Sequence, residues 1–241
     1  MLDLDPASPT REWREQIGIV LQQCRMRPEL TVRETLELYA GYYREPIAVD
    51  DAIDHVGLAE KAGTRAGALS GGQLRRLDVA VALIGDPDLL FLDEPTTGFD
   101  PSARRQAWDM IAGLASLGKT VFLTTHYMDE AQHLAGRVAI IANGRIVAEG
   151  RPGEIGDRGA RATRISFRPA NGAAPADLPN AEQWRPGTGG ELALETRAPV
   201  ETLNRLTAWA LERSLELDGL RVVQPSLEDI YLELTAPEEE Q

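Results

Sequence analysis

The stretch Leu89–Asp100, LLFLDEPTTGFD, decides the fold class of this chain. Its first four residues form a continuous apolar run, which is typical of a strand that is buried on both faces of a parallel sheet. The run ends in two consecutive carboxylates, Asp93 and Glu94, and burying them is costly unless a cation or a proton donor uses them. A proline and a glycine then turn the chain towards Asp100, which is predicted to cap the next helix.

Two further apolar runs, Ile17–Leu21 and Val121–Leu123, are also predicted to be buried parallel strands. Each is followed by a polar residue that a core strand would not otherwise carry, Gln22 after the first and His126 shortly after the second. Ligands of open α/β sheets bind outside the carboxyl ends of the strands. We therefore expect Gln22, His126 and the carboxylate pair to lie at one edge of the sheet and to form a binding site.

The chain between and after these strands predicts two domains. Residues 1–154 are expected to form an α/β domain with a mainly parallel sheet and a helical subdomain over about residues 28–85, which begins near a capping box at Thr31 and Glu34. Asn143-Gly144 predicts a type I′ hairpin turn. Composition shifts near residue 155, and residues 155–241 are expected to form a small α+β domain. Its predicted strands cover residues 164–168, 191–197 and 220–224, its helices cover 200–215 and 227–234, and a loop covers 169–190.

The tetrapeptide Ser70-Gly71-Gly72-Gln73 opens a predicted helix and allows two interpretations. Ser70 and Gln73 can form a capping box, in which case the glycines merely permit a tight helix entry. Alternatively, the paired glycines leave helix N–H groups accessible, so that a phosphate can approach the positive end of the helix. The tetrapeptide by itself leaves both interpretations open.

In their order and spacing, these motifs resemble those of the ATP-binding subunits of ABC transporters over roughly residues 15–150. The ending PSLEDIYLELT resembles the C-terminal extension of the drug- and polymer-export subgroup of that family. The matching segments are the signature LSGGQ (Leu69–Gln73), the Walker B strand LLFLDEP with its catalytic glutamate Glu94, the D-loop at Gly98–Asp100, the Q-loop glutamine Gln22 and the switch histidine His126.

The resemblance implies a P-loop NTPase fold and a site for ATP and Mg²⁺. It implies that Glu94 activates the attacking water and that His126 contacts the γ-phosphate. Asp93 and Gln22 are the implied Mg²⁺ contacts, and the implied nucleotide contacts are Gln22, Ser70, Gly71, Gly72, Gln73 and Asp100. It also implies a partner nucleotide-binding domain in a dimer and a separate transmembrane permease. The chain would then lie in the cytoplasm, on the inner face of the membrane.

GLASLGKT, Gly113–Thr120, matches the phosphate-binding pattern G-x-x-x-x-G-K-[ST] residue for residue. That pattern requires a strand before it and a helix after it, whereas here a predicted helix ends at Gly118 and a predicted strand follows. A helix C-terminus presents carbonyl groups, which repel a phosphate. We therefore interpret GLASLGKT as a helix end followed by a strand start.

No glycine-rich loop precedes Gln22 in the 241 residues, so the resemblance implies an ATP-binding domain without its Walker A region. We expect the chain alone neither to bind ATP tightly nor to hydrolyse it, because it lacks the N–H cradle and the lysine that hold the β- and γ-phosphates. Three explanations stay open: a start assigned inside a longer reading frame, a remnant gene, or a half-partner that lends Ser70 and Gly72 to a nucleotide held by another subunit.

Composition narrows the functional classes. The formal net charge of −13 argues against a broad nucleic-acid-binding face, and a single cysteine, Cys24, excludes an internal disulfide. No apolar run approaches the roughly 18 residues of a membrane span. A regulatory or remnant module that docks on a transporter without hydrolysis is the alternative. A DNA-repair type of ATPase would need coiled coils, zinc ligands and a basic surface. His55 and His133 lie on predicted helices and are expected to be structural.

Overall fold

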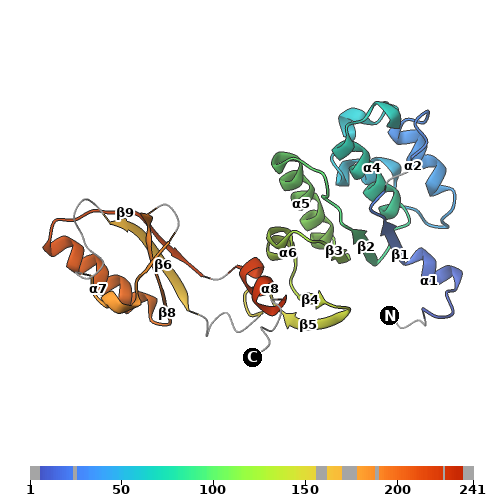
Figure 1. Cartoon of the computed structure of the whole chain (residues 1–241). Helices are drawn as coiled ribbons and strands as arrows, with labels where there is room; N and C mark the ends of the chain where they lie inside the picture. The colour runs from blue at the N-terminus through green and yellow to red at the C-terminus, as the bar shows by residue number, and fades with distance from the viewer. Residues whose placement is uncertain are drawn as a thin grey trace. The chain divides into compact units, whose positions relative to one another are not determined.

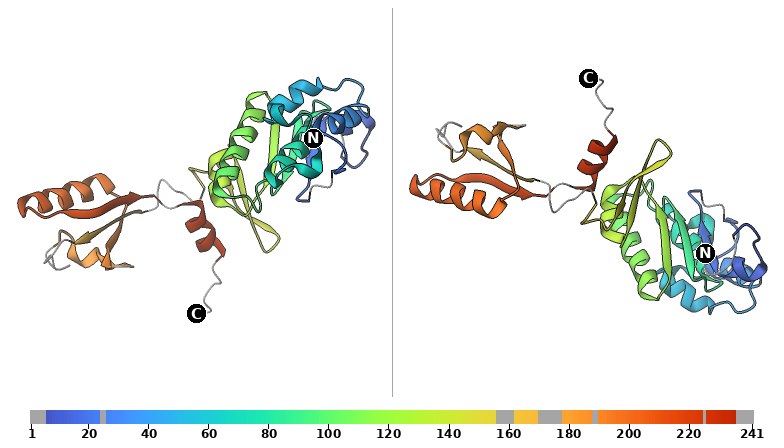
Figure 2. Two further views of the ribbon diagram at one scale, coloured as in Figure 1. Left: turned by 90° about the horizontal axis from the view of Figure 1, so that it is seen from above. Right: turned by 90° about the horizontal axis from the view of Figure 1, so that it is seen from below.

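The computed structural model describes residues 6–23, 26–155, 162–169, 178–187, 190–224 and 226–235. The chain divides into two compact units, residues 1–134 and 135–241 (Figures 1 and 2). Cys24 and the acidic end of the chain lie outside the described residues. Composition placed a boundary near residue 155, whereas the two units separate before the hairpin at Asn143-Gly144, because the strands of that hairpin pair with each other and not with the parallel sheet.

The first unit contains the predicted parallel sheet, and its strand order is β1-β2-β3 (Figure 1). Consecutive parallel strands need helical connections, and helices follow both β1 and β2 in the chain. The elements are α1 (Arg11–Glu15), β1 (Ile17–Val20), α2 (Val32–Ala40), α3 (Val49–His55), two short 3₁₀ turns (Ala59–Lys61 and Ala66–Ala68), α4 (Gly71–Leu83), β2 (Leu89–Asp93), α5 (Pro101–Ser116), β3 (Thr120–Thr124) and α6 (Met128–Leu134).

One face of this sheet forms the core with the helices. Val20, Leu90 and Leu92 are almost fully buried, and they share a cluster with side chains of α2, α3 and α4. Gly18 allows α4 to lie directly on β1, since a Cβ at this position would meet the Ala82 carbonyl oxygen at 2.5 Å. This packing accounts for the apolar residues on one face of the strands, every second position of each run.

The opposite face of the sheet carries an apolar row across the three strands. Ile19, Phe91 and Phe122 are in register, and the two phenylalanine rings lie 5.5 Å apart. Ile19 is 59% exposed and Phe122 is 56% exposed. Parallel sheets are normally covered on both faces, so this row is an open apolar surface among the described residues.

The helix starts are set by side-chain caps. The predicted capping box at Thr31 and Glu34 is present at the start of α2, and its two reciprocal bonds satisfy N–H groups that the helix itself leaves free. Helix α1 was not predicted from the sequence. Thr10 caps it by accepting from the backbone N–H of Trp13, and a threonine before a short polar run was the available signal.

The second unit contains the predicted hairpin, β4 (Val138–Ala142) and β5 (Arg145–Gly150). Asn143 and Gly144 have φ values of 51° and 73°, as a type I′ turn requires. The unit also contains an antiparallel sheet of order β7-β8-β6-β9, so its α+β character is as predicted. Its other elements are β6 (Thr163–Pro169), a 3₁₀ turn (Ala181–Gln183), β7 (Arg185–Pro186), β8 (Leu192–Thr196), α7 (Pro199–Glu212), β9 (Leu217–Val223) and α8 (Leu227–Thr235).

Two features of the second unit differ from the predictions. Strand β9 begins at Leu217, three residues before the predicted start at Leu220, because its pairing with β6 extends to the end of that strand. Within the predicted loop 169–190, β7 pairs with β8, and Trp184 packs edge-on against Phe167 at 5.2 Å. The loop is rich in proline, glycine and alanine, and this composition gave no indication that Trp184 packs into the core. Ser226 and Asp229 cap α8 as predicted.

Candidate functional site

The polar residues that follow β1, β2 and β3 meet at one edge of the sheet, as the strand pattern predicted. The Gln22 side-chain amide donates to Glu94 Oε2 at 2.8 Å. His126 Nδ1 lies 3.3 Å from the other carboxylate oxygen of Glu94. Glu94 is therefore held between a glutamine from the first strand end and a histidine from the third.

The backbone of Glu94 adopts a left-handed conformation, with a φ of 44°. This conformation costs a residue with a side chain roughly 1–3 kcal/mol and is found mainly at functional sites. The Glu94 N–H donates to the Thr124 carbonyl at 3.1 Å and approaches its hydroxyl at 3.2 Å. These bonds to β3 set the direction in which the Glu94 side chain leaves the strand.

The electrostatic surroundings of Glu94 favour its charged form. The Thr97 hydroxyl donates to Glu94 Oε2 at 3.0 Å, and this bond, followed by the contact with His126, lowers the pKa of Glu94 below its ordinary value. The carboxylate is therefore ionised at neutral pH and acts as an acceptor. The Asp93 carboxylate lies next to it and accepts a bond of 2.6 Å from the Thr124 hydroxyl.

The residues at this edge fit a hydrated Mg²⁺. Mg²⁺ in nucleotide sites is held by one or two protein oxygens together with water and phosphate oxygens. Asp93 is exposed at the end of β2, and Gln22 is exposed two residues after β1. Among the described residues no group of three or more His, Cys, Asp and Glu side chains is gathered as a metal site. A carboxylate with an amide therefore fits a nucleotide-dependent Mg²⁺ better than a protein-enclosed ion.

The signature tetrapeptide begins α4 as predicted. Ser70 and Gln73 form both bonds of the capping box. A Cβ at Gly71 would meet no atom within 4 Å, and one at Gly72 would meet only the Phe99 ring, at 3.9 Å. Neither glycine has a positive φ. Because neither packing nor backbone conformation requires a glycine here, the accessible helix N-terminus favours the interpretation in which a ligand approaches it.

Asp100 caps α5, as its place before Pro101 predicted. One of its carboxylate oxygens accepts from the backbone N–H groups of Ser102 and Ala103 at 2.8 and 3.0 Å. These two bonds, that of Ala103 first, lower the pKa of Asp100 below its ordinary value. That carboxylate oxygen is thus occupied by the start of α5.

A cavity of about 570 Å³ lies beside Glu94. It brings together Gln22, the whole tetrapeptide Ser70–Gln73, Glu94 and Asp100. Asp93 and His126 are not among its lining residues. His126 contacts Glu94, and Asp93 accepts a hydrogen bond from Thr124. The remaining lining residues are Leu74, Arg75, Arg76, Pro95, Thr97, Gly98, Phe99, Ala103 and Gln106.

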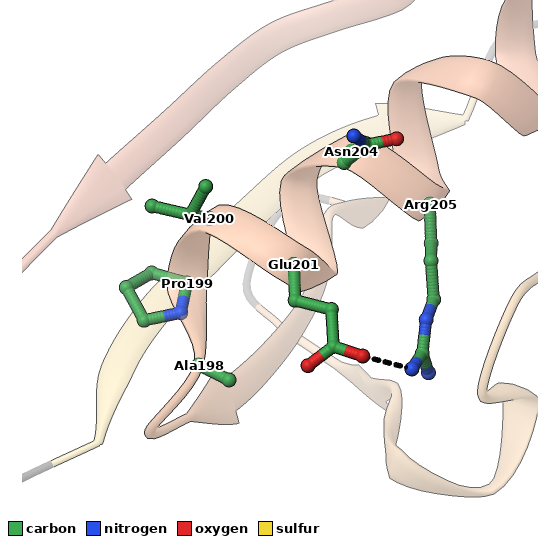
Figure 3. A pocket seen from close by; sticks show the side chains of 6 residues that line it. All are labelled: Ala198, Pro199, Val200, Glu201, Asn204 and Arg205. Carbon is green, nitrogen blue, oxygen red and sulfur yellow. Dashed lines mark hydrogen bonds and ion pairs between the residues drawn. The ribbon is translucent and has the colours of Figure 1, made fainter.

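A second cavity, of about 560 Å³, lies at the start of α7 in the second unit (Figure 3). It is lined by Ala198, Pro199, Val200, Glu201, Asn204 and Arg205. Glu201 and Arg205 face each other there and form an ion pair along the helix. The two charged side chains of this cavity thus pair with each other. The cavity beside Glu94 contains the polar side chains from the strand ends, and we therefore favour it as the functional site.

The structure confirms that GLASLGKT is a helix end followed by a strand start. Gly113 lies inside α5, Gly118 ends the helix with a φ of 84°, and Thr120 begins β3. The Lys119 ammonium group forms an ion pair with Asp86 at 2.6 Å, and the lysine side chain is only 15% exposed. Its charge is therefore used within the fold.

Lys119→Ala is expected to leave any nucleotide binding by the chain unchanged. It should reduce the free energy of unfolding by no more than about 1 kcal/mol, because one partner of the ion pair is largely solvated. Titration with a fluorescent ATP analogue and urea unfolding of the variant test both statements. A large loss of nucleotide binding would return GLASLGKT to consideration as a phosphate site.

Three residues at the site were given no role from the sequence. Thr97 and Thr124 hold the carboxylates of Glu94 and Asp93, and Arg75 lies buried beneath them. Threonine after a strand is too common to be a signal, and Arg75 looked like a surface residue of an amphipathic helix. His133, by contrast, stacks on Trp108 at 5.0 Å, which agrees with the structural role expected for it.

The fold, the site and the comparisons with known proteins together define the class of protein. The parallel α/β unit presents a glutamine, two carboxylates and a histidine at the carboxyl ends of adjacent strands, and its solved neighbours are ATP-binding-cassette domains, which have the P-loop NTPase fold. Residues 2–97 match the family described as "ABC transporter". Residues 163–226 match the C-terminal domain of "ABC transporter domain-containing protein-like" sequences.

Named relatives cover nearly the whole chain. The chain is 39% identical over 237 residues to the "Nod factor export ATP-binding protein I" of Rhizobium leguminosarum bv. viciae. The aligned region covers 94% of this chain and 73% of that protein. It is 37% identical over 251 residues to the protein of the same name from Bradyrhizobium diazoefficiens. That aligned region covers all of this chain and 78% of that protein. The chain therefore belongs to the ATP-binding subunits of ABC transporters.

Solved structures support the same assignment. The chain superimposes on cbiO1 from Clostridium perfringens, part of the ABC transporter complex cbiONQ, with a TM-score of 0.57 and 27% identity, over 63% of this chain and 65% of that one. It superimposes on the ATP-binding cassette MJ0796, a dimer bound to ADP and Pi in a post-hydrolysis state, with a TM-score of 0.52 and 28% identity, over 62% and 68%. No described helix has both the length and the apolar character needed to cross a membrane.

Proposed function

We propose that this chain is the ATP-hydrolysing subunit of an exporter and that it drives a separate membrane permease. The observation that carries the proposal is the Glu94 carboxylate, which is ionised and held by Gln22, Thr97 and His126 at the carboxyl edge of the parallel sheet. The export direction rests on the names of the relatives and on the family match of the C-terminal region. The chain would be bound to the permease and would therefore lie at the cytoplasmic face of the membrane.

Each polar residue at the strand ends has a proposed role in ATP hydrolysis. Bound ATP supplies the γ-phosphoryl group, and bound Mg²⁺ neutralises charge on its oxygens. Glu94 accepts a proton from the attacking water or orients it, since its carboxylate is charged and directed from β2 into the cavity. His126 holds Glu94 and stabilises charge beside it, and Asp93 and Gln22 hold the Mg²⁺.

The signature tetrapeptide is proposed to act towards a nucleotide held by a second nucleotide-binding domain. The open space at Gly71 and Gly72 and the N–H groups of the first turn of α4 suit a phosphate or a ribose that arrives from outside the chain. The dimer of MJ0796 is the precedent for such a pair. Residues 1–154 are proposed as the ATP-binding domain and residues 155–241 as the C-terminal extension. No nucleic-acid partner is proposed.

The 241-residue chain by itself is expected to bind ATP weakly and not to hydrolyse it. Its one sequence match to a phosphate loop is used as a helix end, and Lys119 of that match is paired with Asp86. The described residues place no backbone N–H cradle with its lysine beside Glu94, so the β- and γ-phosphates have little to hold them. Isothermal titration of the purified chain with ATP and Mg²⁺ tests this expectation.

The outcomes of this titration separate the two candidate activities. Binding weaker than the micromolar range agrees with a site that needs a phosphate cradle from elsewhere. Micromolar binding together with phosphate release would show that the chain is catalytically complete. Micromolar binding that Glu94→Gln leaves unchanged, with no phosphate release by the wild-type chain, would favour the non-hydrolysing module instead.

A further inference from the structure

Arg75 is a buried arginine in the second turn of α4, two residues after the signature tetrapeptide. Only 7% of its surface is exposed, and the chain places it under the carboxyl ends of β1 and β2. Arginine is almost never buried unless its charge and its donors are paired. The partners of Arg75 therefore indicate why a helix next to the proposed site contains it.

Three backbone carbonyls from two strand ends accept from the Arg75 guanidinium. Nη2 donates to the Asp93 carbonyl at 2.7 Å, and Nε donates to the Pro95 carbonyl at 3.3 Å. Nη1 donates to the Leu21 carbonyl. The charge itself is balanced by Asp78 on the same helix, at 3.2 Å from Nη1.

These carbonyls have a specific relation to the proposed site. Asp93 and Pro95 are the residues immediately before and after Glu94, whose backbone is left-handed. Leu21 is the residue immediately before Gln22, and Gln22 in turn donates to Glu94. The planar guanidinium thus spans the turn around the catalytic carboxylate and joins it to the backbone of its glutamine partner.

We propose that Arg75 is a positioning residue that holds Glu94 in its left-handed conformation and keeps Gln22 within hydrogen-bond distance of it. The guanidinium has several donors in one rigid plane, which suits three carbonyls that a single ammonium group could not reach in the same geometry. The role deepens the function proposed above for Glu94 and Gln22. Because Arg75 lies on the signature helix, it also ties the segment that faces a second nucleotide to the carboxylate of the chain's own site.

The neighbouring Arg76 provides a matched control. It lies on the same helix and carries the same charge, but it is less buried and donates to the Gln106 side chain rather than to a strand end. Loss of Arg76 removes one positive charge and one side-chain contact without touching the carbonyls around Glu94. Any effect seen with Arg75 and not with Arg76 therefore comes from the bonds to the strand ends.

The experiment compares Arg75→Met, Arg75→Lys and Arg76→Met with the wild-type 241-residue chain by NMR. One readout is the hydrogen-exchange protection of the Glu94 amide, relative to the Leu90 amide in the middle of β2. The other readout is the side-chain amide signal of Gln22. Glu94→Ala removes the acceptor of this amide and therefore gives the reference position of its signal without the hydrogen bond. Neither readout involves hydrolysis, so a failure of this role is distinguishable from a failure of the proposed activity.

In Arg75→Met, protection of the Glu94 amide should fall by about tenfold or more relative to Leu90, and the Gln22 signal should move to its position in Glu94→Ala. Arg75→Lys should restore neither readout, whereas Arg76→Met should retain both. Wild-type values in Arg75→Met, recovery with lysine, or the same loss in Arg76→Met would overturn the proposal. If Arg75→Met does not fold, Arg75→Lys decides alone. Failure of both to fold would also contradict the role, because it would assign Arg75 to the stability of the whole unit.

Discussion

Glu94→Gln is expected to lower ATP hydrolysis by about 10²–10⁴-fold in an ATP-hydrolysing assembly that contains this chain. Glutamine keeps an oxygen that can accept from Thr97, so the site keeps its shape. It cannot take a proton from water, however, and it brings no negative charge next to His126. Phosphate release and equilibrium ATP binding, measured on the same preparation, should separate a loss of turnover from unchanged binding.

A matched control for this prediction is Glu149→Gln in β5. Glu149 is an exposed glutamate whose carboxylate pairs with Arg137, the residue immediately before β4. Its substitution should leave hydrolysis within about twofold of the wild-type rate, since exposed ion pairs contribute little. Hydrolysis that survives Glu94→Gln at a comparable rate would remove Glu94 from the role of the base.

Glu130→Ala is expected to reduce the free energy of unfolding by about 3 kcal/mol. Glu130 is fully buried in α6, and its Oε1 accepts from the Thr96 hydroxyl at 2.8 Å and from the Trp108 indole N–H at 3.0 Å. Truncation leaves both buried donors without an acceptor and opens a cavity. Urea unfolding followed by circular dichroism measures the loss directly on the 241-residue chain.

Glu130→Gln distinguishes the lost hydrogen bonds from the lost charge. Its side-chain oxygen can still accept from Thr96 and Trp108, and the other carboxylate oxygen of Glu130 has no partner that would be lost. We expect a change of about 1 kcal/mol or less, because a side chain of the same size keeps both hydrogen bonds. Glu37→Ala, on the exposed side of α2, should change stability by about 0.5 kcal/mol or less. Equal losses in Glu130→Gln and Glu130→Ala would show that the charge, not the acceptor, stabilises the unit.

Much of the architecture could be predicted from short-range patterns. The three apolar runs are strands β1, β2 and β3, the capping boxes start α2 and α4, and Asn143-Gly144 turns a hairpin. These features depend on local sterics and on hydrogen bonds between neighbours in the chain, which residue types specify directly. Helix α1 and strand β7 were missed because α1 is short and β7 is defined by its pairing with β8.

The site was predicted in its parts and not in its connections. The strand pattern placed Gln22, Glu94 and His126 at one edge, and the structure joins them through Glu94. The bonds of Thr97 and Thr124 to the carboxylates could not be predicted, because threonine is common at such positions and its partners depend on side-chain directions. Arg75 could not be predicted either, since α4 is buried on more sides than its amphipathic pattern indicated.

By itself, the sequence determined the family, the class of fold and the identity of the polar residues at the strand ends. It also determined that GLASLGKT ends a helix, because Gly118 and the order of elements around it are local properties. Only the tertiary structure decided the left-handed backbone of Glu94, the burial of Arg75 beneath it, and the apolar row of Ile19, Phe91 and Phe122 left open on one face of the sheet. Each of these depends on strands and helices far apart in the chain that meet in space, and no local pattern encodes such a meeting.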